Sequence, residues 1–204
     1  MANIMNVDYE AIPAIARQVR SYAQDLNIQM LDIYNNISEM HNSWYGIRYN
    51  TLAKDFNNIM PEINDLLDLV VTEIPYTLET IANNYALVDR GSKVTSAEKT
   101  PAKRVTSLAM PNDVGMRFLT NEVTSVKSKV ATNFTSAKEI MNMIETTYNR
   151  VEWRSEAAEA FKMRFTKLKN NIVNAFDNLE LQFIKLMTQT LEDIQATENA
   201  NTVQ

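Results

Sequence analysis

The chain repeats one pattern of apolar residues at an offset of 109 positions, and this repeat restricts the folds that it can adopt. The repeated pairs are Trp44 with Trp153, Leu52 with Phe161, Phe56 with Phe165, Ile59 with Leu168, Ile63 with Ile172, Val70 with Leu179 and Ile74 with Phe183. From Leu52 and Phe161 onwards the steps are three, four or seven residues, which place the side chains on one face of a helix. We therefore expect two similar helical units.

Each unit contains two apolar stripes, so the sequence predicts four long amphipathic helices, over residues 7–42, 47–89, 114–150 and 156–195. Only three glycines and five prolines occur in 204 residues, and this scarcity of turn residues favours long helices over a strand-rich protein. We expect an all-α fold with no strand in the helical spans.

The two units should pack against each other through their apolar faces. A helical hairpin exposes one such face, and two hairpins bury both by forming an elongated antiparallel four-helix bundle. The side chains expected in the core between the hairpins are those of Leu52, Phe56, Ile63, Phe161, Phe165 and Ile172.

The domain boundaries follow from where the helical pattern stops. Residues 1–89 form the first hairpin. Residues 90–112, where one glycine and two prolines interrupt the pattern, are expected to be a flexible linker. Residues 113–204 form the second hairpin, with a frayed end from Ala196 onwards. Within the second predicted helix, Pro61 and Pro75 should cause kinks or a break, because an interior proline removes a backbone hydrogen bond.

Charge is distributed unevenly between these segments. The first hairpin has a net charge of −8, the linker +4 and the second hairpin −1. Four basic residues lie close together on the fourth predicted helix, namely Lys162, Arg164, Lys167 and Lys169. They could face carboxylates of the first hairpin and fix its register, or they could form a solvated polar face.

The residue types needed for catalysis or metal binding are poorly represented. The chain has no cysteine and one histidine, His41, which excludes thiolate chemistry and a paired Glu-x-x-His di-iron site. Glu62, Asp65 and Asp68 could share a helix face, but they lack the glycine-containing loop of a calcium site. No glycine-rich phosphate loop or nucleophile elbow occurs. We expect a protein without catalytic residues, metal or cofactor.

The sequence also bears on membrane contact and on nucleic acid. Met1–Glu10 lacks a basic start followed by an apolar run, so we expect no cleaved signal peptide. The most apolar stretch, Leu66–Ile74, is far shorter than the roughly 20 residues of a membrane-spanning helix. The basic linker could touch acidic lipids, but the total charge of −5 argues against nucleic acid as a main partner.

The predicted reversal of the first hairpin falls at Trp44-Tyr45-Gly46. A cysteine-free helical hairpin of about this length with Trp-X-Gly at its bend resembles the Trp-X-Gly, or ESAT-like, proteins of bacterial type VII secretion. The resemblance covers nearly the whole chain, as two fused copies. In the second copy the turn is Trp153-Arg154-Ser155, with Ser155 in place of the glycine, where it could cap the next helix.

In that family, export is directed by a Tyr-x-x-x-Asp/Glu motif that follows the second helix. Tyr85 and Asp89 match this motif in spacing and in place, so the resemblance implies that they form a secretion signal. At the equivalent positions of the second half, the acid is kept as Glu198 but the ring is replaced by Ile194. Tyr148 and Glu152 have the same spacing before the second turn and are not expected to act in export.

The resemblance implies a type VII secretion substrate or a co-secreted helical adaptor whose two hairpins replace the usual dimer. Its partners would be the secretion ATPase and other co-secreted proteins. The protein would be cytoplasmic before export, and then secreted or held at the cell surface. Two alternatives are a membrane-active secreted effector, which inserts its apolar faces, and a cytoplasmic helical scaffold unrelated to secretion.

Overall fold

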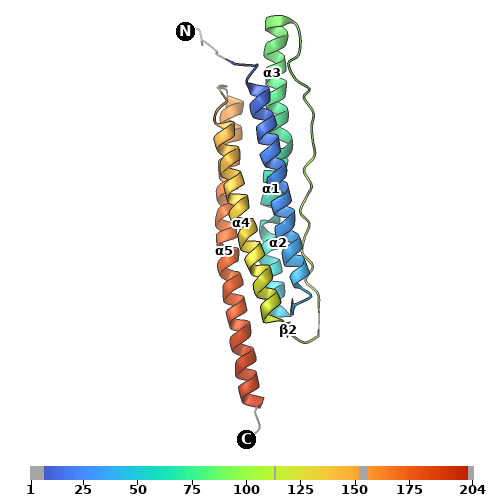
Figure 1. The fold of residues 1–204 in the computed structure, drawn as a ribbon, viewed down its shortest axis with the longest axis vertical. Coiled ribbons are helices and arrows are strands. Elements are labelled where there is room, and N and C mark those ends of the chain that lie inside the picture. The colour runs from blue at the N-terminus through green and yellow to red at the C-terminus, as the bar shows by residue number, and fades with distance from the viewer. Residues whose placement is uncertain (1–6, 113, 152–155, 202–204) are drawn as a thin grey trace.

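The computed structural model describes residues 7–112, 114–151 and 156–201. Helices cover most of these residues, and the all-α fold class is confirmed (Figure 1). In chain order the elements are α1 (Ile12–Met40), β1 (Trp44–Tyr45), α2 (Ile47–Leu67), the π-helix η1 (Asp68–Glu73), α3 (Ile74–Arg90), β2 (Arg117–Phe118), α4 (Thr120–Tyr148) and α5 (Glu156–Asn201).

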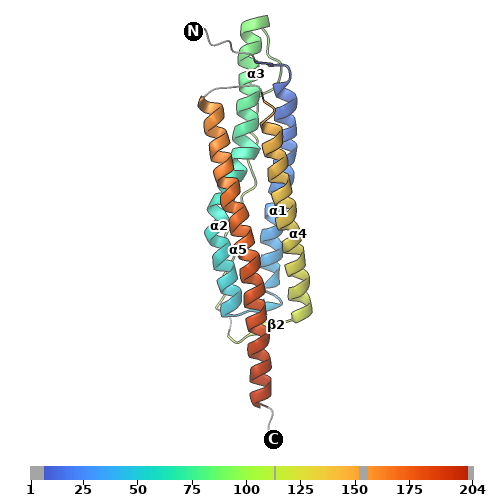
Figure 2. The ribbon, with the colours of Figure 1, turned by 90° about the vertical axis from the view of Figure 1, so that its left-hand side faces the viewer.

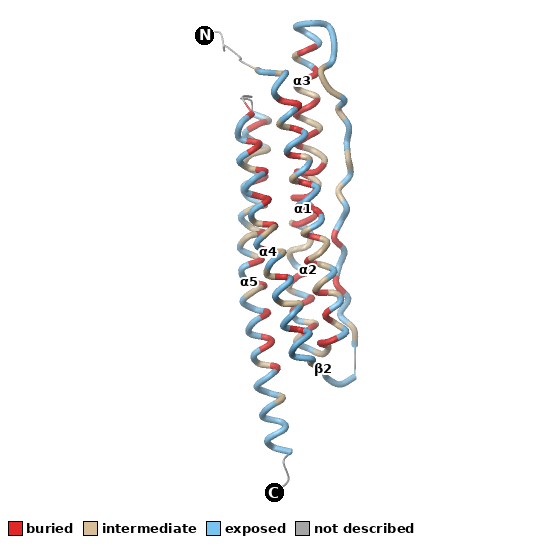
Figure 3. The backbone as a smooth tube through the Cα atoms, viewed as in Figure 1, coloured by how far each residue is buried: buried red, intermediate tan, exposed pale blue. Residues whose placement is uncertain are grey.

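The helices lie side by side along the long axis of the molecule (Figures 1 and 2). Helix α1 packs against α4 and α3, and α2 packs against α5. Helices α2 and α5 run in opposite directions, since Arg48 pairs with Asp193 near one end whereas Glu73 pairs with Arg164 farther along. Buried residues recur along the inward faces of these helices (Figure 3).

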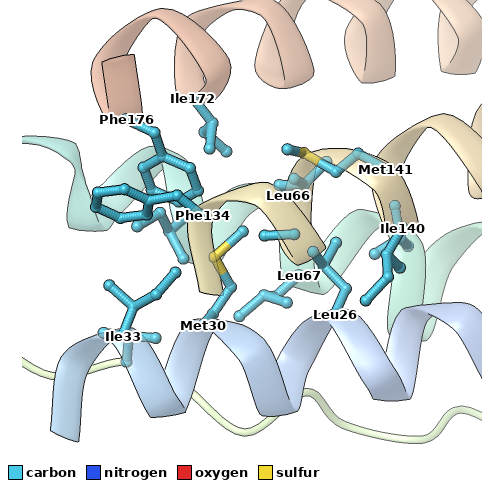
Figure 4. Close-up of a cluster of buried hydrophobic side chains, with 14 of the residues drawn as sticks. Leu26, Met30, Ile33, Leu66, Leu67, Phe134, Ile140, Met141, Ile172 and Phe176 are labelled. Atoms are coloured by element: carbon cyan, nitrogen blue, oxygen red, sulfur yellow. The ribbon is translucent and has the colours of Figure 1, made fainter. Parts of the chain in front are cut away.

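Five of the six residues expected in the core between the hairpins are buried, and Phe161 is half-buried. Ile172 belongs to a cluster that joins α1, α2, α4 and α5 (Figure 4). In this cluster the rings of Phe134 and Phe176 stack with their centroids 4.4 Å apart. Side chains from both halves of the chain therefore share one hydrophobic core.

Helix α2, the π-helix η1 and α3 follow one another without an intervening loop. Pro61 lies inside α2 and does not end it. Pro75 lies in the first turn of α3, where a missing N–H is tolerated, and the π-helix precedes it directly. The irregularity expected at Pro75 is thus a π-helical segment, in which the N–H of Ile74 donates to the carbonyl of Leu69.

The segment expected to be a flexible linker is instead an ordered, extended strap, which we define as residues 92–112. It lies on the side of α1–α3 away from α4 and α5 (Figure 1). The chain has to run back along the molecule here, because α3 ends at the opposite end from the start of α4 (Figure 1). The continuous helical segment of α2, η1 and α3, residues 47–90, is about 66 Å long at 1.5 Å per residue. Twenty-six residues, 91–116, span it only when largely extended, at about 3.3 Å each.

Two predicted helix starts also need correction. Helix α1 begins at Ile12, because Asp8 accepts the backbone N–H groups of Glu10 and Ala11 and forms a turn. The predicted helix 114–150 begins only at Thr120, because Arg117–Phe118 pair with Trp44–Tyr45 as a short antiparallel ladder. The expectation of no strand in the helical spans was therefore wrong there.

The C-terminal end is helical to Asn201, whereas fraying was expected from Ala196. Glu156–Asn201 contains no glycine or proline that would end the helix. The last turns of α5 project beyond the other helices (Figure 2) and are largely exposed. Their helical structure therefore rests on the continuity of α5 and not on packing.

Candidate functional site

Trp44, the first residue of the predicted turn motif, is a buried packing centre. Its side chain is 1% exposed. Its ring stacks on Phe183 of α5 at 5.9 Å and meets the edge of Phe118 of β2 at 5.4 Å. The N–H of Leu119 donates to the carbonyl of Ser43 at 2.8 Å, which extends the pairing beside the ring. Trp44 thus joins the first turn to α5 and to β2, the strand just before α4.

Gly46 provides the backbone conformation that starts α2. Its φ is +119°, a region that residues with a Cβ atom rarely adopt. A hollow of about 350 Å³ opens beside it, and its lining includes Ile47, Arg48 and Met116. Among the described residues of that lining, Arg48 and Tyr45 carry the ionisable side chains. The second turn, with Trp153 and Ser155, lies outside the described residues.

The predicted secretion signal lies at the end of α3. Tyr85 is half-buried and Asp89 is exposed, and they are four residues apart in one helix. The hydroxyl of Tyr9 donates to the Asp89 carboxylate, and this hydrogen bond raises the pKa of Tyr9. Beside it, Arg90 pairs with Glu10 at 3.3 Å. The sequence stripes gave no indication of these contacts, because Tyr9 and Glu10 precede the first helix.

Tyr148, which has the same spacing to an acid, is in a different environment. It is 4% exposed, and its hydroxyl donates to the carbonyl of Ala158 at 3.4 Å. Burial raises the pKa of Tyr148 to about 12. The residue therefore packs the second hairpin together, whereas Tyr85 reaches the surface. Glu152 lies outside the described residues.

His41 lies next to aromatic rings near the first turn. The ring centroid of His41 is 5.1 Å from that of Tyr49 and 6.1 Å from that of Tyr45. Among the described residues, no group of three or more histidine, cysteine, aspartate or glutamate side chains could hold a metal ion. Within the same residues, no helix is long and apolar enough to cross a membrane.

The basic cluster on α5 divides between the two halves. Arg164 reaches Glu73 of the first hairpin at 2.7 Å, as the first interpretation of the cluster expected. Lys169 pairs with Glu145 of α4 at 2.5 Å, and Lys162 lies 3.8 Å from Glu159 of its own helix. Opposite charges therefore connect the hairpins at Arg164, while the other two pairs stay within the second half.

Sequence reasoning missed a row of amide side chains under the strap. In four cases the Asn Nδ2 donates to the carbonyl of a strap residue and the Asn Oδ1 accepts the N–H of the same residue. These pairs are Asn27 with Lys103 (2.7 and 2.8 Å), Asn57 with Leu108 (3.0 and 2.7 Å), Asn64 with Val105 (2.9 and 2.9 Å) and Asn83 with Thr95 (3.0 and 3.1 Å). Two more side chains each make one hydrogen bond to the strap: Asn50 donates to the carbonyl of Pro111 at 3.0 Å, and Thr72 donates to the carbonyl of Thr100 at 2.6 Å.

The seven-residue spacing of Asn50, Asn57 and Asn64 is the sequence signal that could have revealed this row. Residues seven apart in a helix lie on one face, so three asparagines at this spacing form a polar line beside the apolar stripe. Side-chain amides can satisfy both the donor and the acceptor of a main-chain peptide group. The row therefore indicates binding of an extended backbone.

Comparison of the chain with protein-family models, with curated proteins and with solved structures finds no match.

Proposed function

We propose that the chain is a substrate or co-secreted adaptor of bacterial type VII secretion. In this proposal its two Trp-X-Gly-like hairpins pack as one elongated antiparallel four-helix bundle, so that a single chain replaces the dimer of the family it resembles. A contact between repeat-related positions supports this arrangement. Asn171, which lies 109 residues after Glu62, donates to the Glu62 carboxylate at 3.2 Å. Equivalent residues meet in this way near the two-fold axis of a symmetric pair.

The observation that carries the proposal is the surface position of Tyr85 and Asp89. They lie one turn apart at the end of the first hairpin, and a receptor could contact the ring and the carboxylate together. In the proposal this receptor is the secretion ATPase. Losing either contact should weaken binding by about 2 kcal/mol, or roughly thirtyfold.

Export measurements test the proposal directly. Wild type, Tyr85→Ala and Asp89→Ala are expressed in a bacterium with a type VII system, and the protein is measured in the medium and in the cells. Both variants should keep the wild-type melting temperature within a few degrees, while export falls and cell-associated protein accumulates. A strain without the secretion ATPase gives the level of release that does not depend on the pathway.

Two substitutions serve as matched controls. Tyr76→Ala removes another half-buried tyrosine of α3, one that has Thr80 instead of an acid four residues later. Tyr9→Phe removes the hydroxyl that binds Asp89 but leaves the carboxylate in place. Both should be exported like the wild type. If the Tyr85 and Asp89 variants also leave the cell at wild-type levels, these residues are not an export signal.

A further inference from the structure

The strap is bound mainly through its backbone. Of its described side chains only those of Val105 and Leu108 are buried, at 2% and 3% exposure. By contrast, the four two-way asparagine pairs contact only N–H and C=O groups, which every residue except proline carries. The helices therefore bind an extended main chain and two buried apolar side chains three residues apart, and Val94 and Ala102 are partly buried against the same core.

The helix face under the strap is specific to the first hairpin. At the offset of 109 residues, Asn50, Asn57, Asn64 and Asn83 correspond to Glu159, Thr166, Val173 and Glu192. None of these side chains has the separate NH₂ donor and C=O acceptor with which an amide binds both groups of one peptide residue. The row is thus an addition to the repeated hairpin and not a consequence of its packing.

Charge adds a preference to this backbone recognition. Arg104, next to the buried Val105, pairs with Asp68, and the ammonium group of Lys99 lies 4.9 Å from the centre of the Tyr76 ring. The hairpin below carries a net charge of −8, and the strap is basic. A basic segment is therefore favoured over an acidic one on this face.

We infer that the face of α1–α3 formed by Asn27, Asn50, Asn57, Asn64, Thr72 and Asn83 is a binding site for an extended, basic peptide with apolar side chains three residues apart. The strap is its internal occupant. A segment of the same chemistry from another polypeptide binds there when the strap detaches. This inference does not depend on the secretion proposal.

The internal occupant competes strongly with an external one. A tethered segment acts at an effective concentration of about a millimolar, so an external peptide has to overcome this advantage. Weakening the strap without altering the helices should therefore expose the site. Val105→Ser with Leu108→Ser does this, because it removes the two buried anchors and leaves every asparagine of the face intact.

The probe is a fluorescent synthetic peptide with the sequence of residues 93–111, and its binding is followed by fluorescence anisotropy. We expect the full-length Val105→Ser/Leu108→Ser variant to bind it at least tenfold more tightly than the wild type. Adding Asn57→Ala and Asn64→Ala to that variant should weaken binding at least tenfold. Circular dichroism establishes that each variant keeps its helices. If the double variant loses them, Val105→Ala replaces it under the same criteria.

Two altered peptides separate backbone recognition from side-chain recognition. Methylating the backbone nitrogens of Val105 and Leu108 removes the N–H groups that Asn64 and Asn57 accept, and should reduce affinity at least tenfold. Changing the exposed Thr106 to alanine should leave affinity unchanged. The inference is overturned if a helical, strap-weakened variant fails to bind the parent peptide, or if it binds the methylated peptide equally well.

Discussion

Replacing Glu79 by alanine should lower the free energy of unfolding by about 3 kcal/mol. The Glu79 side chain is 2% exposed, and its two carboxylate oxygens each accept a hydrogen bond from Arg20 at 2.8 Å. Arg20 also donates to the carbonyl of Glu98 in the strap at 3.3 Å. The alanine variant leaves the guanidinium with that weaker acceptor in a mostly buried position. Breaking a buried pair costs roughly 3–5 kcal/mol, and the lower end applies because Arg20 is 20% exposed.

The same reasoning predicts a different result for removing both charges. Arg20→Met with Glu79→Leu leaves no unpaired charge and keeps the apolar volume. Replacing a buried ion pair by apolar residues often changes stability little. The free energy of unfolding of the double variant should therefore lie within about 1 kcal/mol of the wild-type value. The two single effects should therefore be strongly non-additive.

Urea unfolding at neutral pH, followed by circular dichroism, measures these differences. Glu10→Ala is the matched control, because Glu10 pairs with Arg90 at the surface, where the two side chains are 70% and 42% exposed. It should change stability by less than about 1 kcal/mol. If Glu79→Ala costs no more than Glu10→Ala, the buried pair does not stabilise the junction of α1, α3 and the strap as argued.

Three further predictions concern the core, the first turn and pH. Phe165→Ala should lower the free energy of unfolding, measured in urea, by about 3–5 kcal/mol. Met163→Ala should lower it by less than about 0.5 kcal/mol, because that side chain is 73% exposed. Equal losses would contradict the assignment of Phe165 to the core face. Gly46→Ala should lower the free energy of unfolding by about 1–3 kcal/mol, because φ of +119° with ψ of −172° is adopted almost only by glycine, and an unchanged melting temperature would refute that reason. Burial raises the pKa of Tyr49 to about 12, so the unfolded chain ionises first and stability falls as the pH rises from about 10 to 12. Tyr49→Phe should reduce this loss, and an identical pH profile would exclude Tyr49 as its source.

The apolar stripes allowed much of the helical structure to be predicted. The stripes correctly identified buried residues such as Phe56, Ile63 and Ile172. Apolar side chains at helical spacing lie on one face of a helix, and that face packs against the core. The turn at Trp44 was located by the same reasoning, since the apolar stripe of the first hairpin is interrupted there and the first glycine follows. Periodicity carries this information because it is local in the sequence.

The strap and the contacts of the candidate signal could not be predicted in this way. The strap has no periodicity of its own, and its order comes from helix residues that are 11 to 78 positions away. The contact between Tyr9 and Asp89 spans 80 positions and depends on how α1 and α3 are aligned. Side-chain pairs of this kind follow from tertiary packing, which no single stretch of sequence specifies.

The π-helix has a consequence for the angular alignment of the strap contacts. Thr72 lies eight residues after Asn64, and in an uninterrupted α-helix this step would rotate it by about 80° from the row. The wider turn of η1 reduces that rotation, and both side chains reach the strap. Deleting one residue from Asp68–Glu73 would shorten this step to seven residues, so that a regular α-helix in place of η1 would keep Thr72 on the face of Asn64. Asn83 would then still face Thr95, and Glu79 would still face Arg20, whereas the same deletion in the regular part of α3 before Glu79 would turn both side chains by about 100°.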